Sequence, residues 1–366
     1  MELDDMNKIT QAEADRDPLN RIPYHHTRLH PLSTMRTAVR HHWTTVLGIG
    51  ALVALVVAVD PHKVLSAIHQ ADPRLLLLMV PCVVAIYAFR SITWWIELRF
   101  LGLGVSFTDA VIVTFISQLF VFLPGGDLWR VPIVKTQVRF PVESGIIAGV
   151  VVFDDLLYFF VLTLIMGVTM GKSLFLVIGF LALLVPQCIV FGILLSQSVF
   201  TFLSEAVLRW RWVSHFGPYV RSIGPTCRRL ARPRIILQVI CIDTVAASCA
   251  ALLFFLGLAA VHAHVSFAKT AAVYAFGQVS SNYTVIPGAL GVYEGLMTAL
   301  IAVQGVSPAR AAVGALLYRA TNDVLMAVVG FGIALVTGHL HRLAEDEHAV
   351  PDTDGPPGDA TEDASG

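Results

Sequence analysis

Charged side chains inside apolar runs are the residues of this sequence that could do chemistry. Arg319 lies ten residues into an apolar run that begins at 309, about 15 Å deep by the rise of a helix. A charge at that depth in a bilayer costs at least about 2.5–3.5 kcal/mol, so such residues normally pair or face a polar cavity. Arginine suits phosphate because its planar guanidinium donates two hydrogen bonds at once. The other charges of this kind are Asp154, Asp155, Asp243, Glu294 and Asp323.

Spacing leaves two interpretations of these charges open. Arg319 and Asp323 are four residues apart and can meet on one helix face, either as a structural ion pair or as part of a functional site. Asp154 and Tyr158 have the same spacing and the same two interpretations. A metal between Asp154 and Asp155 is disfavoured, because adjacent helical residues point about 100° apart and no histidine is near. We therefore expect no metal and no cofactor.

Two stretches break the apolar pattern with proline and glycine. The first is 118–130 (QLFVFLPGGDLWR) and the second is 281–295 (SNYTVIPGALGVYEG). In lipid, broken backbone is tolerated only where protein or a water-filled cavity surrounds it. Both stretches are therefore predicted to be half-membrane turns that line a site, although each could be a plain loop between two short spans. The predicted substrate-binding residues are Gln118, Gly125, Gly126, Arg130, Asp154, Asp155, Asn282, Gly288, Gly291, Glu294, Arg319 and Asp323.

The composition is that of an all-α polytopic membrane protein. Apolar residues make up 56% of the chain and charged residues only 14%, with a mean hydropathy of +0.72. A polar N-terminal segment (1–42) and an acidic tail (343–366) flank a membrane domain (43–342). The predicted apolar segments are 43–59, 74–95, 107–123, 144–170, 173–195, 235–260, 268–286, 290–304 and 309–337. Trp94 and Trp95 read as an interfacial anchor, with Arg90 and Arg99 at or beyond the end of their run.

Basic residues orient the chain. The polar loop at 196–234 carries seven arginines against one acid, and residues 21–40 carry four more. Nucleic-acid binding is one interpretation of such a loop, but the positive-inside rule is the better one, and we expect no nucleic-acid partner. Both basic segments are then cytoplasmic, which requires an even number of crossings between them. Re-entry of 107–140 leaves four crossings and places both termini in the cytoplasm.

The two halves then have the same plan in opposite orientations. Each consists of two spans, one broken hairpin and one span, which gives about six full spans and two re-entrant hairpins. About 30 residues separate Pro124 from Asp154, and a similar number separate Pro287 from Arg319. Inverted repeats with broken helices that meet near the midplane are typical of secondary transporters. The pattern predicts a substrate site between the two hairpins.

Four motifs resemble the lysylphosphatidylglycerol synthase transmembrane-region family, which consists of flippase-like bacterial membrane proteins. Residues 286–295 (IPGALGVYEG) are similar to its Pro-x-x-x-Gly-x-Gly-Val-x-Glu pattern, and 123–130 (LPGGDLWR) to its Gly-Gly-Asp-x-x-Arg element. Residues 151–160 and 315–325 resemble its charged span and its Leu-Tyr-Arg span. The similarity covers about 43–340. Tyr293 and Asp155 depart from the pattern, since the family often has arginine there, so the site is more acidic here.

The resemblance implies a protein that translocates a lipid or a lipid-linked intermediate in the bacterial inner membrane. We expect no C-terminal aminoacyl-transferase domain, and no Walker A motif is present, so an enzymatic activity is not indicated. The expected partners are membrane lipids, either an anionic phospholipid or a lipid-linked substrate, and an envelope-biosynthesis enzyme is a further candidate. Two alternatives stay open: a membrane-embedded lipid-modifying transferase, and an accessory subunit of an envelope lipid or glycan enzyme.

Overall fold

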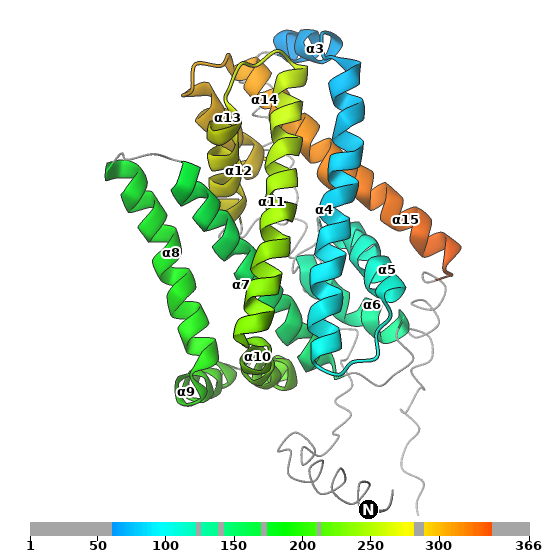
Figure 1. Cartoon of the computed structure of the whole chain (residues 1–366), viewed down its shortest axis with the longest axis vertical. Helices are drawn as coiled ribbons and strands as arrows, with labels where there is room; N and C mark the ends of the chain where they lie inside the picture. Colours follow the sequence, from blue (N-terminus) through cyan, green and yellow to red (C-terminus); the bar gives the residue numbers. More distant parts are fainter. Residues whose placement is uncertain are drawn as a thin grey trace, which may run out of the picture. The chain divides into compact units, whose positions relative to one another are not determined.

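The computed structural model describes residues 61–121, 126–137, 143–169, 174–210, 214–281 and 289–338. Every regular element in these residues is helical. Five helices are long and apolar enough to cross a membrane, and Figure 1 shows most of them running along its vertical axis. They are α4 (Pro73–Phe100), α7 (Ser144–Thr169), α8 (Leu174–Leu195), α11 (Pro233–Ala260), and the continuous run of α14 (Pro308–Arg319), η6 (Ala320–Leu325) and α15 (Met326–Val336).

These helices confirm the all-α polytopic fold that the composition predicts. The apolar run predicted at 43–59 lies outside the described residues. A short helix, α3 (Pro61–His69), precedes α4 and packs on α14. We call the two ends of the bundle the α3 end and the α10 end, after the short helices found there (Figure 1).

Both broken stretches lie in helical hairpins. The first hairpin consists of α5 (Phe107–Ser117), η2 (Gln118–Phe120), η3 (Gly126–Trp129) and α6 (Arg130–Gln137). The second consists of α12 (Phe267–Ser281) and α13 (Val292–Ala302). Helices of 8 to 15 residues are about 12–22 Å long, too short to cross a bilayer. The first hairpin lies beside the α10 end of the long helices and the second beside the α3 end, as two re-entrant hairpins require (Figure 1).

The packing follows the inverted repeat. The long helices α4 and α11, which have 28 residues each, pack on one another. Each hairpin packs on the last span of the other half: α5 lies against α15, and α12 lies against α7. The sequence carries a matching signature, because Val105-Ser106-Phe107 opens the first hairpin and Val265-Ser266-Phe267 opens the second. This exchange of contacts is the one expected of two halves with the same plan in opposite orientations.

The end of α4 differs from the sequence prediction. The apolar run was expected to close at an interfacial Trp94-Trp95 pair, but the helix continues to Phe100 and Trp94 is fully buried. Arg90 is also buried, inside the helix and not at its end. The prediction was wrong because other helices, and not water, surround this part of α4. It moves Arg90 from the expected headgroup region into the interior.

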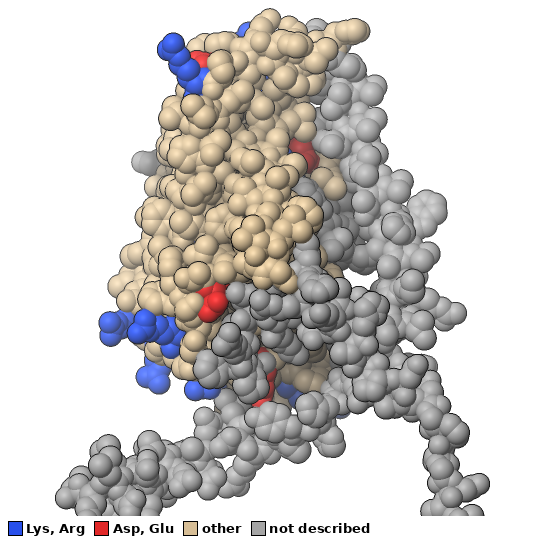
Figure 2. All heavy atoms as spheres, turned by 90° about the vertical axis from the view of Figure 1, so that its right-hand side faces the viewer, with Lys and Arg blue, Asp and Glu red and all other residues tan. Residues whose placement is uncertain are grey.

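The polar loop expected at 196–234 is largely helical. It contains α9 (Gln197–Leu208), η4 (Ser214–Phe216) and α10 (Gly217–Leu230). Helix α10 packs on α7 through buried Thr226 and Cys227 and on α9 through buried Gly224, while Arg221 and Arg229 are exposed. In the described part of the face that Figure 2 shows, Lys and Arg gather near the two ends and the band between them is almost free of charge. This distribution is the one expected of a bundle that spans a bilayer.

Gly330 permits the close approach of α15 to α5, and its replacement should destabilise the fold. A Cβ at this position would overlap the carbonyl oxygen of Phe115, a backbone atom that cannot rotate away. We expect Gly330→Ala to cost about 1–3 kcal/mol, the usual range for overpacking. Gly332→Ala is the matched control on the same helix, because its Cβ would meet no heavy atom within 4 Å. Unfolding midpoints in detergent should fall for the first variant only; equal midpoints would contradict the close packing.

Candidate functional site

Five charged residues meet where the first hairpin approaches α4 and α7. This first cluster consists of Arg90 on α4, Asp127 on η3, Arg130 at the start of α6, and Asp154 and Asp155 on α7. Asp154 is fully buried and accepts from both arginines, at 3.2 Å from Arg90 Nη2 and 3.2 Å from Arg130 Nη1. Two guanidinium groups around one buried carboxylate make Asp154 the centre of the cluster.

Arg130 is held on several sides. Its Nη2 lies 2.8 Å from Asp127 Oδ1, its Nη1 pairs with Asp154, and its guanidinium carbon lies 5.4 Å from the centre of the Trp94 ring. The side chain is only 2% exposed. Such a residue ties η3 and α6 to α7 and therefore fixes the position of the hairpin tip.

Arg90 and Asp127 are the two members of the first cluster that were not among the predicted substrate-binding residues, and Arg90 is the more deeply buried. Its Nη2 lies 3.2 Å from Asp154 and 3.5 Å from Asp155, and its guanidinium lies 4.5 Å from the centre of the Tyr158 ring. Its buried Nη1 has no hydrogen-bond partner among the residues that the structure describes. The available signal was depth, since Arg90 lies far inside the apolar run that begins at Pro73. Arg130 Nε is also without a hydrogen-bond partner among the described residues, so each arginine of the cluster retains an unused guanidinium donor.

A second cluster lies at the tip of the second hairpin. Arg319 Nε lies 2.6 Å from Asp323 Oδ2, and Arg319 Nη1 lies 3.4 Å from Glu294 Oε1. The i,i+4 pair expected from spacing is thus present, and Glu294 from the hairpin joins it. Arg319 directly precedes the π-helical segment η6, which contains Asp323. Single π-helical turns interrupt α-helices frequently at functional sites.

Glu294 also caps the N-terminus of α13. Its Oε2 accepts the backbone N–H of Gly291 at 2.6 Å, so one carboxylate joins the helix start to Arg319. Gly291 has a φ of +77°, a conformation that L side chains adopt at a steric cost. Glycine at 291 is therefore required by the turn that places Glu294.

Tyrosines connect the two clusters through the middle of the bundle. The Tyr87 hydroxyl lies 3.0 Å from Gln118 Oε1 and 3.1 Å from the Asn322 carbonyl oxygen, so it bridges the first hairpin and η6. The hydroxyls of Tyr158 and Tyr274 lie 3.1 Å apart. Ring contacts complete a row from one arginine to the other, in the order Arg90, Tyr158, Tyr274, Tyr318, Tyr293 and Arg319.

The remaining predicted residues fall in several places. Gln118 is buried and contacts Tyr87, outside both clusters. Gly126 begins η3, next to the first cluster. Asp154 does not pair with Tyr158: both arginines contact Asp154 Oδ2, and the Tyr158 hydroxyl lies 3.1 Å from that of Tyr274. Asn282, Gly125 and Gly288 lie outside the described residues.

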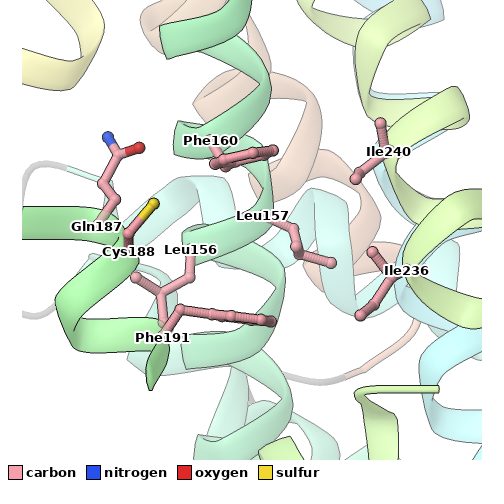
Figure 3. Close-up of a pocket in the computed structure, with 8 residues that line it drawn as sticks. All are labelled: Leu156, Leu157, Phe160, Gln187, Cys188, Phe191, Ile236 and Ile240. Carbon is pink, nitrogen blue, oxygen red and sulfur yellow. The ribbon is translucent and has the colours of Figure 1, made fainter. Parts of the chain in front are cut away.

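Neither metal chemistry nor a reactive thiol emerges from the described part of the chain. No three His, Cys, Asp or Glu side chains there are placed to hold a metal ion. Burial raises the pKa of the Cys227 thiol on α10 to about 12, so this thiol is a poor nucleophile. Figure 3 shows a cavity of about 190 Å³ between α7, α8 and α11. Its lining is almost entirely apolar: Leu156, Leu157, Phe160, Gln187, Cys188, Phe191, Ile236 and Ile240.

Comparison with known proteins gives one clear result. The model of the family described as "Lysylphosphatidylglycerol synthase TM region" matches residues 43–330, which is most of the chain and includes both clusters. No curated protein matches the sequence.

Proposed function

The chain belongs to the lysylphosphatidylglycerol synthase transmembrane-region family, and from this premise we propose that it moves a lipid or lipid-linked intermediate across the bacterial inner membrane. The polar headgroup passes the level of the two charged clusters, between the tips of the hairpins. Both termini lie in the cytoplasm, with the basic surface of α10 at the same side.

Three features of the bundle support this proposal. Buried charges within long apolar helices are costly and usually mark a pathway for a polar substrate. Both clusters lie at interruptions of regular helix: Arg130 begins α6 after the first break, and Glu294 lies in the first turn of α13 after the second. The two halves also pack as an inverted repeat, the arrangement in which transporters place substrate at the repeat interface.

The first cluster has the chemistry of a headgroup that carries both a phosphate and an amine. The unpartnered Nη1 of Arg90 can donate to a phosphate oxygen. Asp155 is 29% exposed and lies 3.5 Å from Arg90, whereas Asp154 is fully buried, so the Asp155 carboxylate is the more accessible of the two to an ammonium group. Arg130, which was predicted from the sequence to bind substrate, is better suited to hold Asp127 and Asp154 in place.

The observation that carries the proposal is the partly exposed Arg90–Asp155 pair beside a fully buried Asp154. We expect Asp155→Asn to slow the movement of amine-bearing lipids by about 10–100-fold, the loss expected when one charged hydrogen bond is removed. The assay uses liposomes with acyl-labelled fluorescent phosphatidylethanolamine or aminoacylated phosphatidylglycerol, and a membrane-impermeant quencher that reports the leaflet.

The matched control is Glu205→Gln, which removes a carboxylate from an exposed ion pair with Arg221 on α10. This variant should move lipid at the wild-type rate. Acyl-labelled phosphatidylglycerol without an amine should be moved more slowly than its aminoacylated form. If wild-type protein moves none of these lipids, the transport proposal is wrong; if Asp155→Asn matches wild type, the headgroup assignment is wrong.

A further inference from the structure

Glu97 is a buried carboxyl group that neither cluster uses. It lies on α4, three residues before the helix ends at Phe100, and it is 0% exposed. Neither of its side-chain oxygens has a hydrogen-bond partner among the residues that the structure describes. The two nearby arginines, Arg90 and Arg130, direct their ion pairs to Asp154, and neither forms one with Glu97 among the described residues.

An ionised carboxylate in this position would be poorly stabilised. The cost of burying an unpaired charge is several kcal/mol, and a carboxyl group avoids it by keeping its proton. The charged groups that act most strongly on Glu97 are Asp154 on α7, Asp243 on α11, Arg90 on its own helix and Arg130 on α6. The Cys227 thiol of α10 also faces it. Because both arginines form their ion pairs with Asp154, neither stabilises an ionised Glu97 by direct contact, and the neutral carboxyl group is favoured.

Asp243 is the second carboxyl group of this kind. It is 0% exposed, its Oδ1 accepts from the Thr93 hydroxyl at 3.1 Å, and its Oδ2 has no partner within the described segments. Thr93 and Glu97 are four residues apart on α4 and therefore lie on the same face, about 5–6 Å apart at Cβ. The contact with Thr93 thus places Asp243 about one helical turn from Glu97.

The carboxyl groups form a path from the α10 end toward the middle of the bundle. Glu97 lies about 4.5 Å from the end of α4, whereas Asp243 and Asp154 lie about 15 Å along α11 and α7 from the same end. The ends compared here are those beside α10 (Figure 1). A proton that enters at the α10 end therefore reaches Glu97 before Asp243 and the first cluster.

We propose that Glu97 and Asp243 form a proton-binding pair that couples the movement of lipid to a proton gradient. The proposal rests on the proposed function, because it supplies the energy source for that movement. A water molecule between the two groups carries the proton from the Glu97 carboxyl to the Asp243 carboxylate, and Glu97 takes up another from the α10 side; only O–H bonds form and break. The charge of Asp243 acts on Arg90 of the first cluster, so a proton on Asp243 weakens the attraction of the carboxylates for that guanidinium and leaves it to a phosphate.

The first experiment needs no lipid substrate. Infrared spectra of the purified full-length protein at neutral pH should contain the C=O stretching band of protonated carboxyl groups. Glu97→Gln should lower this band, and the exposed-site control Glu205→Gln should leave it unchanged. Glutamine keeps the shape and neutrality of a protonated glutamate, so the fold should survive. An identical band in Glu97→Gln and wild type would overturn the proposal, because Glu97 would then be ionised.

The second experiment measures coupling. Liposomes that contain acyl-labelled fluorescent phosphatidylethanolamine receive a pH difference of one unit, with valinomycin and potassium to clamp the membrane potential. Coupling to one proton supports a steady leaflet asymmetry of up to about tenfold per pH unit, since one unit is worth 1.36 kcal/mol. Wild type and Glu205→Gln should build this asymmetry. Glu97→Gln and Asp243→Asn should leave the label equally distributed.

The outcomes separate the two proposals. Asymmetry in Glu97→Gln equal to that of wild type overturns proton coupling through this residue, while transport itself stands. Equal distribution in wild type, reached faster than in protein-free liposomes, shows uncoupled transport and also overturns coupling. No movement above that of protein-free liposomes overturns the proposed function, and the infrared band then reports the protonation of Glu97 alone.

Discussion

Asp154→Leu is expected to destabilise the protein by about 3–5 kcal/mol, the largest stability effect that we predict for a single substitution. Asp154 is fully buried and is the one carboxylate that pairs with both Arg90 and Arg130. Its removal leaves the Nη2 of Arg90 with only the 3.5 Å contact to Asp155, and leaves Arg130 with Asp127. Unfolding midpoints in detergent would measure the loss.

The neighbouring residue supplies a matched control. Asp155→Asn removes one carboxylate from the same helix, but Asp155 is 29% exposed and its ion pair is longer. We expect this variant to lose less than about 1 kcal/mol, in the range of partly solvated ion pairs. A stable Asp154→Leu would contradict the burial of the two guanidinium groups, because only water could then replace the missing carboxylate.

The order of spans and hairpins could be predicted from the sequence because it depends on the length of apolar runs. The runs predicted at 144–170 and 173–195 correspond to α7 and α8 within about one residue. The Pro-Gly breaks at Pro124 and Pro287 could be assigned to hairpins because interrupted backbone needs protein or water around it. The requirement for an even number of crossings between the two basic segments then led to the inverted repeat. That requirement constrains the whole chain.

The partners of each charge could not be predicted in the same way. The pair of Arg319 and Asp323 follows from helical spacing, whereas Arg90 and Asp154 are brought together only by the packing of α4 on α7. The second run was also ended too early, at Trp95, because the Trp94-Trp95 pair and Arg99 were interpreted as a membrane interface. The buried, unpartnered state of Glu97 depends on four other helices and has no local signature.

Arg319 will distinguish a transport site from a structural ion pair. Arg319→Lys should lower lipid movement at least about tenfold while the protein stays folded, because an ammonium point charge cannot copy the bidentate guanidinium. The double variant Arg319→Met with Asp323→Leu should also be folded, since it removes both members of the shorter ion pair, and Glu294 loses only its 3.4 Å contact with Arg319. In this double variant, Glu294 Oε2 still accepts a hydrogen bond from the backbone N–H of Gly291, at 2.6 Å.

The activity of that double variant decides between the two roles. If Arg319 only neutralised Asp323, the matched removal of both charges would restore lipid movement, and the single change Arg319→Met would be the damaging one. If Arg319 contacts the headgroup as it passes the second hairpin, the double variant should be stable in detergent and inactive in liposomes. We expect the second result. A stable and active double variant would remove Arg319 from the site and leave the first cluster as the place where the headgroup is bound.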